Sequence, residues 1–120
     1  MQYLLMIYSD EQIWAGMSQA EHEAEYKRYG AFGKEFASAI VGANPLQPTS
    51  VATTVRLRDG KVLTTDGPFA ETKEQLGGYY LVEAGNLDEA VAMAAKIPAA
   101  RVGSIEVRPI QKFSVPQGGM

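Results

Sequence analysis

The sequence has no cysteine and only one histidine among its 120 residues. The lack of cysteine excludes disulfide bonds, thiolate metal sites and a cysteine nucleophile together. The single histidine has no H-x-x-x-H or E-x-x-H spacing around it, so we expect no metal site. Glycine-rich phosphate loops and G-x-S-x-G nucleophile elbows are also missing, which disfavours nucleotide cofactors and serine hydrolase chemistry. We therefore expect no cofactor.

Basic charge and long apolar runs are also scarce. The formal net charge is -3, and a protein that binds nucleic acid needs a cationic surface for the phosphates, so we expect no nucleic-acid partner. No apolar run reaches the length of a membrane span, and the N-terminus lacks the basic head of a secretory signal, which predicts a soluble cytoplasmic protein. The length fits one domain, over residues 1–113, and the last residues, SVPQGGM at 114–120, are expected to form a flexible tail.

Two helices are predicted from capping signals and apolar spacing. Ser18 and Glu21 form a capping box, which predicts a helix start, and Asn86 with Glu89 repeats the pattern. The expected inward stripe of the first helix is Tyr26, Tyr29, Gly33, Phe36 and Ile40. The expected stripe of the second is Leu87, Ala90, Val91, Ala94 and Ile97, and Pro98 ends that helix.

The remaining regular segments are predicted to be strands. QYLLMIY at 2–8 is apolar at nearly every position, and the segments 51–58 and 61–65 alternate around Asp59-Gly60, a pair typical of a type I′ hairpin. Two more strands are expected at 79–83 and 104–110. We interpret VGANPLQPTS, at 41–50, as a loop.

The order β-α-β-β-β-α-β favours an α+β fold, a ferredoxin-like sandwich. Two helices cover one face of such a sheet, yet the strands at 2–8 and 79–83 carry apolar side chains on both faces. An uncovered apolar face favours a homodimer packed sheet to sheet, which would be a dimeric α+β barrel. The alternative is that a loop or the C-terminal segment covers the second face.

TTDGPFAETKEQLGGYYLVE, at 64–83, resembles the signature of the DGPF-domain proteins, a branch of the YciI-like (YCII-related) family. YLLMIYSDEQIWA, YGAFGKEF and NLDEAVAMAAKIPAAR resemble other parts of the same family, so nearly the whole chain is covered. The resemblance implies a dimeric α+β barrel and a bacterial protein. It also implies that the protein belongs to a group whose members are proposed to be small enzymes and are often associated with extracytoplasmic-function sigma factors. Related YciI-like proteins have a histidine and an aspartate suggested as an active-site pair.

The stretch that starts at Asp66 is longer than a hairpin turn, and loops of this length tend to be functional or flexible. Gly67 can adopt a positive φ and Pro68 stiffens the chain, so Phe69 would be presented on a rigid support. Glu71 and Lys73 follow, on what we expect to be a helical turn, and are candidate ligand-binding residues. The alternative is a structural role for this stretch: Asp66 forms the bend, the Phe69 ring packs in the core, and the charged side chains of Glu71 and Lys73 are solvated.

His22 is the candidate general acid or base, because its unperturbed titration lies near neutrality. Asp66 would orient the ring or stabilise charge. Tyr26 and Tyr79 are candidate hydroxyl donors at the pocket wall. The alternatives are an exposed histidine in the first helical turn and tyrosines that serve the core or an interface.

These features lead to a hypothesis of a small-molecule-binding protein or a cofactor-independent enzyme. Its pocket would lie between the sheet and the first helix, and it would perform acid–base chemistry on a small organic acid or lactone-like molecule. The alternative hypothesis is a non-catalytic regulatory module associated with an extracytoplasmic-function sigma factor.

Overall fold

A computed structural model describes residues 1–113, so the predicted tail at 114–120 lies outside the described residues. Its helices and strands include the two helices and five strands that the sequence patterns predicted, together with a short helix at Glu11–Ala15 and a strand at Ile40–Pro45 that they did not predict. In chain order they are β1 (Gln2–Ser9), α1 (Glu11–Ala15), α2 (Gln19–Glu35), β2 (Ile40–Pro45), η1 (Thr49–Val51), β3 (Thr53–Arg58), β4 (Lys61–Asp66), β5 (Gln75–Glu83), α3 (Leu87–Ala94), η2 (Pro98–Arg101) and β6 (Ser104–Pro109).

The main sheet has the strand order β2-β5-β1-β6, with every neighbouring pair antiparallel. Without the β3–β4 hairpin, the chain reads β-α-β-β-α-β with the strand order of a ferredoxin-like fold, which confirms the predicted α+β class. The expected loop at 41–50 is wrong in its first half, because Ile40–Pro45 forms the edge strand β2 beside β5.

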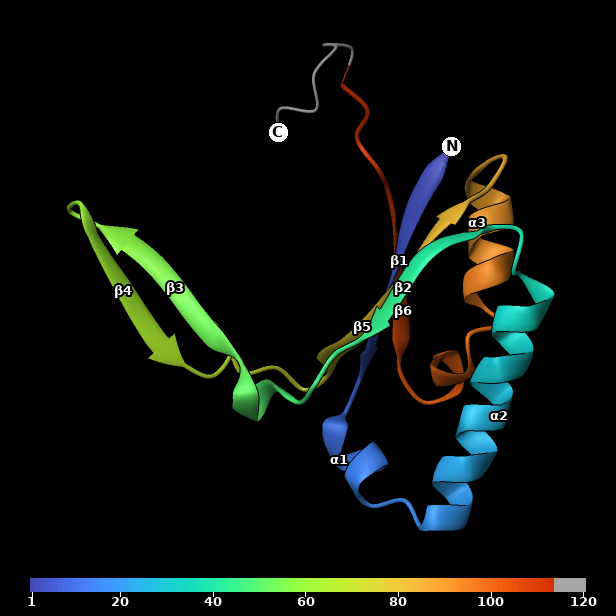
Figure 1. Ribbon diagram of the computed structural model, residues 1–120, viewed down its shortest axis with the longest axis horizontal. Coiled ribbons are helices and arrows are strands. Elements are labelled where there is room, and N and C mark those ends of the chain that lie inside the picture. The colour runs from blue at the N-terminus through green and yellow to red at the C-terminus, as the bar shows by residue number, and fades with distance from the viewer. Residues whose placement is uncertain (114–120) are drawn as a thin grey trace.

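The β3–β4 hairpin forms a two-stranded sheet of its own, separate from the main sheet. In Figure 1 α2 and α3 lie on one side of the main sheet, and the hairpin projects from the other side. The turn at Asp59-Gly60 has φ values of 51° and 74°, so the predicted hairpin turn with two positive φ angles is confirmed. We call residues 53–66 the arm.

The core lies between the main sheet and the helices. Alternate residues of β1 (Tyr3, Leu5 and Ile7) point into it and meet Phe32 of α2 and Ala90 of α3. The core side chains therefore fill the space between the sheet and α2, where the sequence analysis placed a pocket. That placement is not supported.

The predicted caps are present at both main helices. Ser18 accepts a hydrogen bond from the Glu21 backbone N–H, and the Glu21 carboxylate accepts one from the Ser18 backbone N–H, so the capping box is complete. The Ser18 backbone N–H first and the Ser18 hydroxyl second lower the pKa of the Glu21 carboxyl group. Asn86 caps α3 in the same way by accepting from the Glu89 N–H.

The predicted inward stripe of α2 is shifted. Tyr26 is 64% exposed, whereas Glu25 and Phe32 are buried and Tyr29 and Phe36 pack against the core. The helix ends at Glu35, so Ile40 belongs to β2. The side of α2 that carries Tyr26 therefore faces away from the core.

Candidate functional site

The only histidine of the chain lies against a short helix that the sequence analysis missed. Asp10 caps α1 by accepting from the Gln12 N–H, and the helix is only five residues long. Its Trp14 ring stacks on the His22 ring, with centroids 4.2 Å apart and an interplanar angle of 23°. The contact between α1 and the first turn of α2 therefore fixes the plane of the imidazole.

A hydrogen bond fixes the rotation of the same ring. His22 Nε2 lies 2.8 Å from the Trp14 carbonyl oxygen, which can only accept, so Nε2 is the donor. In the neutral imidazole the proton then sits on Nε2, and Nδ1 keeps its lone pair. The arrangement is that of a positioned base, with a backbone carbonyl in the orienting role that an aspartate takes in many enzymes.

Tyr26 completes an aromatic cluster around this histidine. It lies one turn after His22 on α2, and its ring meets Trp14 edge to face with centroids 5.5 Å apart. Trp14 is 40% exposed and Tyr26 64%, so the cluster of Trp14, His22 and Tyr26 lies at the surface. We refer to these three residues as the His22 cluster.

The loop that follows the arm is anchored at its start and exposed along its length. Gly67 has a φ of 95°, as predicted, and its N–H donates to the Ala52 carbonyl at 2.7 Å. The Thr54 hydroxyl donates to the Gly67 carbonyl at 2.8 Å. Phe69 is 79% exposed and does not pack in the core of this chain. The expected helical turn around Glu71 and Lys73 is not formed, and both side chains are exposed.

Tyr79 lies on β5, on the sheet face away from the helices. It pairs with Met6 of β1 on one side and with Asn44 of β2 on the other. Its hydroxyl accepts a hydrogen bond from the Asn44 side-chain amide at 2.8 Å. Tyr79 is therefore a fixed residue of the uncovered sheet face, not of the His22 cluster.

The candidate residues thus fall into separate groups within one chain. Of the seven, only His22 and Tyr26 lie together, whereas Asp66, Phe69, Glu71 and Lys73 belong to the base of the arm and its exit loop. Figure 1 shows the end of β4 well apart from the start of α2. No hydrogen bond joins His22 to Asp66 in residues 1–113, so the catalytic pair stays a prediction.

Glu11 links the base of the arm to α1 and was not singled out from the sequence. Its carboxylate accepts from the Thr49 N–H at 2.8 Å, and its own N–H donates to the Gln75 side chain at 2.9 Å. The start of α1 is therefore tied both to the segment that enters the arm and to the strand that leaves its exit loop. The N-cap aspartate at position 10 was a sequence signal for α1.

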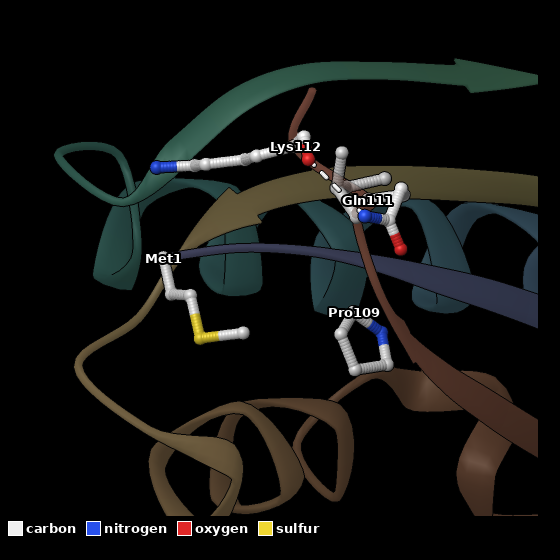
Figure 2. Close-up of a pocket in the computed structure, with 5 residues that line it drawn as sticks. Met1, Pro109, Gln111 and Lys112 are labelled. Carbon is white, nitrogen blue, oxygen red and sulfur yellow. Dashed lines mark hydrogen bonds between the residues drawn. The ribbon is translucent and has the colours of Figure 1, made fainter. Parts of the chain in front are cut away.

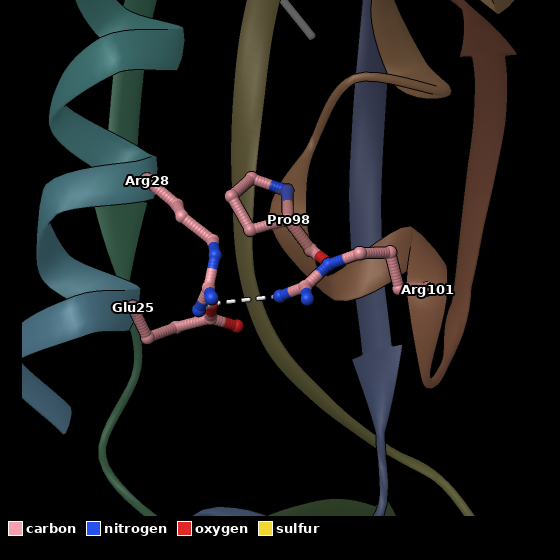
Figure 3. Close-up of polar contacts among 4 residues, drawn as sticks. All are labelled: Glu25, Arg28, Pro98 and Arg101. Atoms are coloured by element: carbon pink, nitrogen blue, oxygen red, sulfur yellow. Dashed lines mark hydrogen bonds and ion pairs between the residues drawn. The ribbon is translucent and has the colours of Figure 1, made fainter. Parts of the chain in front are cut away.

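A buried carboxylate is the second feature that sequence reasoning missed. Glu25 is 5% exposed, and its Oε1 accepts from Arg28 Nη1 at 3.1 Å and from Arg101 Nη2 at 2.8 Å (Figure 3). Arg101 belongs to η2, so this interaction joins two distant parts of the chain. Nearby, burial first and the charge of Glu25 second raise the pKa of Tyr29 to about 12. No sequence signal marks a glutamate as the residue that turns inward.

Two open hollows lie elsewhere on the surface. One, of about 340 Å³, is bordered by Met1, Pro109, Ile110, Gln111 and Lys112 (Figure 2). The other, of about 360 Å³, lies between α2 and the α3–η2 segment beside Arg28 and Arg101. Neither is lined by His22 or Asp66, so neither supports the predicted site.

In residues 1–113 no group of three or more His, Asp or Glu side chains is placed to hold a metal ion. None of the helices in that range is both long and apolar enough to span a membrane.

The fold and the His22 cluster define a small α+β protein of ferredoxin-like topology with an aromatic, histidine-bearing surface site. The chain belongs to the YCII-related domain family, whose model matches residues 1–114.

Comparisons with single proteins agree with this assignment. An uncharacterised protein of Rhizobium meliloti (strain 1021) is 38% identical over 117 residues, and the match covers 94% of each chain. Among solved structures, the chain is similar to 5-chloro-2-hydroxyhydroquinone dehydrochlorinase from Burkholderia phenoliruptrix AC1100, solved in complex with 2,5-dihydroxybenzoquinone. That similarity has a TM-score of 0.53 at 15% identity and covers 94% of this chain and 96% of the other, and it shows a shared fold.

Proposed function

We propose that this protein is a cofactor-independent enzyme that binds a small organic molecule at the His22 cluster and moves a proton with His22. The observation that carries the proposal is the fixed position of the His22 imidazole. The Trp14 ring stacks on it, the Trp14 carbonyl oxygen accepts a hydrogen bond from Nε2, and Nδ1 keeps a lone pair. A general base needs such placement before its titration matters.

The surroundings of the histidine favour a flat substrate that carries an ionisable oxygen. Trp14 and Tyr26 offer ring surface and edge for stacking. The dehydrochlorinase with a related fold was solved with a dihydroxybenzoquinone, which supports a small ring compound or an organic acid of similar size. In the reaction we propose, Nδ1 removes a proton from a carbon or hydroxyl of the substrate and later returns it. Asp66 would stabilise the imidazolium that forms in between.

We further propose a homodimer, a dimeric α+β barrel, as the working form. The support is the uncovered face of the main sheet, which carries Leu4, Met6, Tyr79 and Leu81 opposite the helical layer. Apolar faces of this kind pack against a second sheet in many two-fold assemblies. A ligand at the His22 cluster would then lie beside a boundary between two copies.

The test uses the only tryptophan of the chain, Trp14, as an intrinsic reporter. A panel of small carboxylic acids, lactones and hydroxyquinones, including 2,5-dihydroxybenzoquinone, is titrated while Trp14 fluorescence is followed, with correction for quinone absorbance and calorimetry as a second readout. We expect at least one compound to bind and exchange a carbon-bound proton with solvent deuterium. The variant His22→Asn should slow that exchange roughly 100-fold or more.

Glu23→Gln is the matched control, because Glu23 is an exposed neighbour on the same turn of α2. It should leave binding and exchange unchanged. Full activity of His22→Asn, or no fluorescence or calorimetric response to any compound, would contradict the proposed function.

A second candidate function is a non-catalytic module that binds an extracytoplasmic-function sigma factor. One observation favours it: apolar side chains on the arm are exposed and free for a partner. Co-purification of the sigma factor with the wild-type chain, lost on substitution in the arm, would support this candidate over the enzyme.

A further inference from the structure

We propose that the open hollow between α2 and the α3–η2 segment is a second ligand site, which binds a small monocarboxylate with an apolar body through Arg28 and Arg101. We call it the α2–η2 hollow. The inference goes beyond the proposed function, because the hollow shares no lining residue with the His22 cluster. Its role is binding, since a guanidinium stays protonated at neutral pH and cannot act there as an acid or base.

One wall of the α2–η2 hollow is a single stripe of α2. It carries four lining residues: Arg28, Ala31, Phe32 and Glu35. Their spacing of three or four residues puts them on the same side of the helix. The other wall comes from the segment that follows α3 and from η2, at 95–98 and Arg101. The volume of about 360 Å³ is at the lower end of the range of small-molecule sites, about 300 to 1,000 Å³.

The floor of this hollow is apolar. Phe32, Ile97 and Pro98 line it and are buried, so they present carbon atoms at its base. Ala31 and Ala95 line it as well, and their side chains are single methyl groups that leave the space open. A bare inorganic ion gains nothing from such a floor, whereas a ligand with a hydrocarbon body buries apolar surface on it.

Two guanidinium groups border the hollow beside this floor. Arg28 on α2 and Arg101 on η2 both donate to Oε1 of Glu25, at 3.1 Å and 2.8 Å. Figure 3 shows the two side chains reaching this one oxygen from opposite sides. The guanidinium groups therefore lie next to each other, and one carboxylate balances only one of their two positive charges.

The remaining charged residues of the hollow balance each other. Lys96 Nζ lies 2.7 Å from Glu35 Oε2, so this pair adds no net charge. The α2–η2 hollow, together with Glu25 beside it, therefore keeps one excess positive charge. A monoanion neutralises that charge, whereas a dianion such as phosphate would replace it with an excess negative charge. The charge balance thus favours a carboxylate as the ligand group.

Both guanidinium groups also keep hydrogen-bond donors for such a ligand. Arg101 donates from Nε to the Pro98 carbonyl oxygen at 3.0 Å and from Nη2 to Glu25, which fixes the plane of the group. Within residues 1–113, Nη1 of Arg101 and Nη2 of Arg28 donate to no other group.

The exposure and shape of these groups suit a carboxylate. The side chain of Arg28 is 51% exposed and that of Arg101 54%, so solvent and solutes reach both. A planar guanidinium matches the two oxygens of a carboxylate. Because Glu25 already holds both side chains in place, a ligand loses less affinity to side-chain ordering than it would on free arginines.

The first experiment locates the site by NMR titration of the isotopically labelled full chain. Phenylacetate is the probe, and we expect saturable shifts of the backbone amides of Ala31, Phe32, Ala95 and Lys96. Phenylethyl alcohol has a similar body without the charge, and inorganic phosphate has charge without the body. Each should bind at least roughly tenfold more weakly than phenylacetate. Shifts confined to Trp14 and His22, no saturable shift, or equal affinity for phosphate would overturn the inference.

The second experiment removes one guanidinium. Arg28→Gln should weaken phenylacetate binding roughly tenfold, the scale of one lost hydrogen bond between charged groups. Lys27→Gln is the matched control: it takes the same charge from the adjacent, exposed position of α2, which does not line the hollow. It should leave the dissociation constant unchanged. Equal effects of the two variants would mean a general charge effect and would overturn the site.

The third experiment fills the hollow without touching a charge. Ala31→Phe puts a ring into the space above the floor and should also weaken phenylacetate binding roughly tenfold or more. Its matched control is Ala92→Phe, at an exposed alanine of α3 outside the lining. Because both sites are exposed, both variants should fold. Unchanged binding by Ala31→Phe would overturn the place of the apolar body.

These outcomes separate the second site from the proposed proton transfer. His22→Asn should shift at the α2–η2 hollow with the wild-type affinity for phenylacetate, and Ala31→Phe should keep the proton exchange of the wild-type protein. Loss of hollow binding in His22→Asn would overturn the independence of the two sites. Failure of the exchange assay alone leaves the hollow to be judged by its own titration.

Discussion

Removal of the negative charge of Glu25 should destabilise the fold and loosen η2 from α2. The Glu25 side chain is 7% exposed, and a single oxygen accepts hydrogen bonds from Arg28 and Arg101. Glu25→Gln keeps the volume and the accepting oxygen but loses the charge. We expect this variant to lower the free energy of unfolding by about 2 kcal/mol, the scale of one hydrogen bond to a charged group.

Arg28 and Arg101 should not contribute equally to the free energy of unfolding. The two side chains are about equally exposed, at 51% for Arg28 and 54% for Arg101, but Arg28 lies three residues from Glu25 on the same helix, so Arg28→Ala should cost at most about 0.5 kcal/mol. Arg101 makes the shorter contact, at 2.8 Å, and comes from η2. Its loss leaves a buried carboxylate with one partner, and we expect Arg101→Ala to cost about 2 kcal/mol.

Urea unfolding followed by circular dichroism would measure these differences, with every variant at the same protein concentration because the homodimer that we propose would gain stability with concentration. A double-mutant cycle of Glu25→Gln with Arg101→Ala would isolate the pair. The reasoning would be refuted if Arg28→Ala cost as much as Arg101→Ala, or if Glu25→Gln were neutral.

Four further predictions concern stability. Burial raises the pKa of Tyr29 from 10.0 to about 12, so the neutral phenol is favoured in the folded state and the stability it contributes is lost between pH 10 and pH 12. Tyr29→Phe should reduce that alkaline loss in urea titrations at several pH values, by at most about 3 kcal/mol. Ser18→Ala removes the capping box and should lower the thermal midpoint, at a cost of about 1 kcal/mol. Gly33→Ala, with open space at its Cβ, should stabilise α2 by up to about 1 kcal/mol in the same scans. Gly78→Ala should destabilise by about 2 kcal/mol, since its Cβ would meet the Asn44 carbonyl oxygen at 2.9 Å.

The parts of the fold that the sequence predicted well depend on neighbours within a few residues. The caps at Ser18 and Asn86 and the turn at Asp59-Gly60 are set by hydrogen bonds or φ angles that local chemistry determines. The edge strand Ile40–Pro45 was missed because its composition resembles a loop, and its conformation depends on pairing with β5.

The parts of the site that were missed depend on distant contacts. Alternation in β3 and β4 predicts strands, but it does not tell which sheet they join, so the arm was not foreseen. In the same way, the rotation of α2 depends on contacts with distant segments: Glu25 and Phe32 are buried, Glu25 contacts Arg101 from η2, and Tyr26 lies outward beside Trp14. His22 was singled out as the only histidine of the sequence, but Trp14, which it contacts, lies eight residues away in a helix that was not predicted.

The position of β1 at the centre of the sheet has a consequence for the order of events during synthesis. β1 emerges first, yet both of its neighbours, β5 and β6, come from the last half of the chain. Such long sequence separations slow closure of a sheet. The apolar first strand therefore stays unpaired until β5, which ends at Glu83, has left the ribosome.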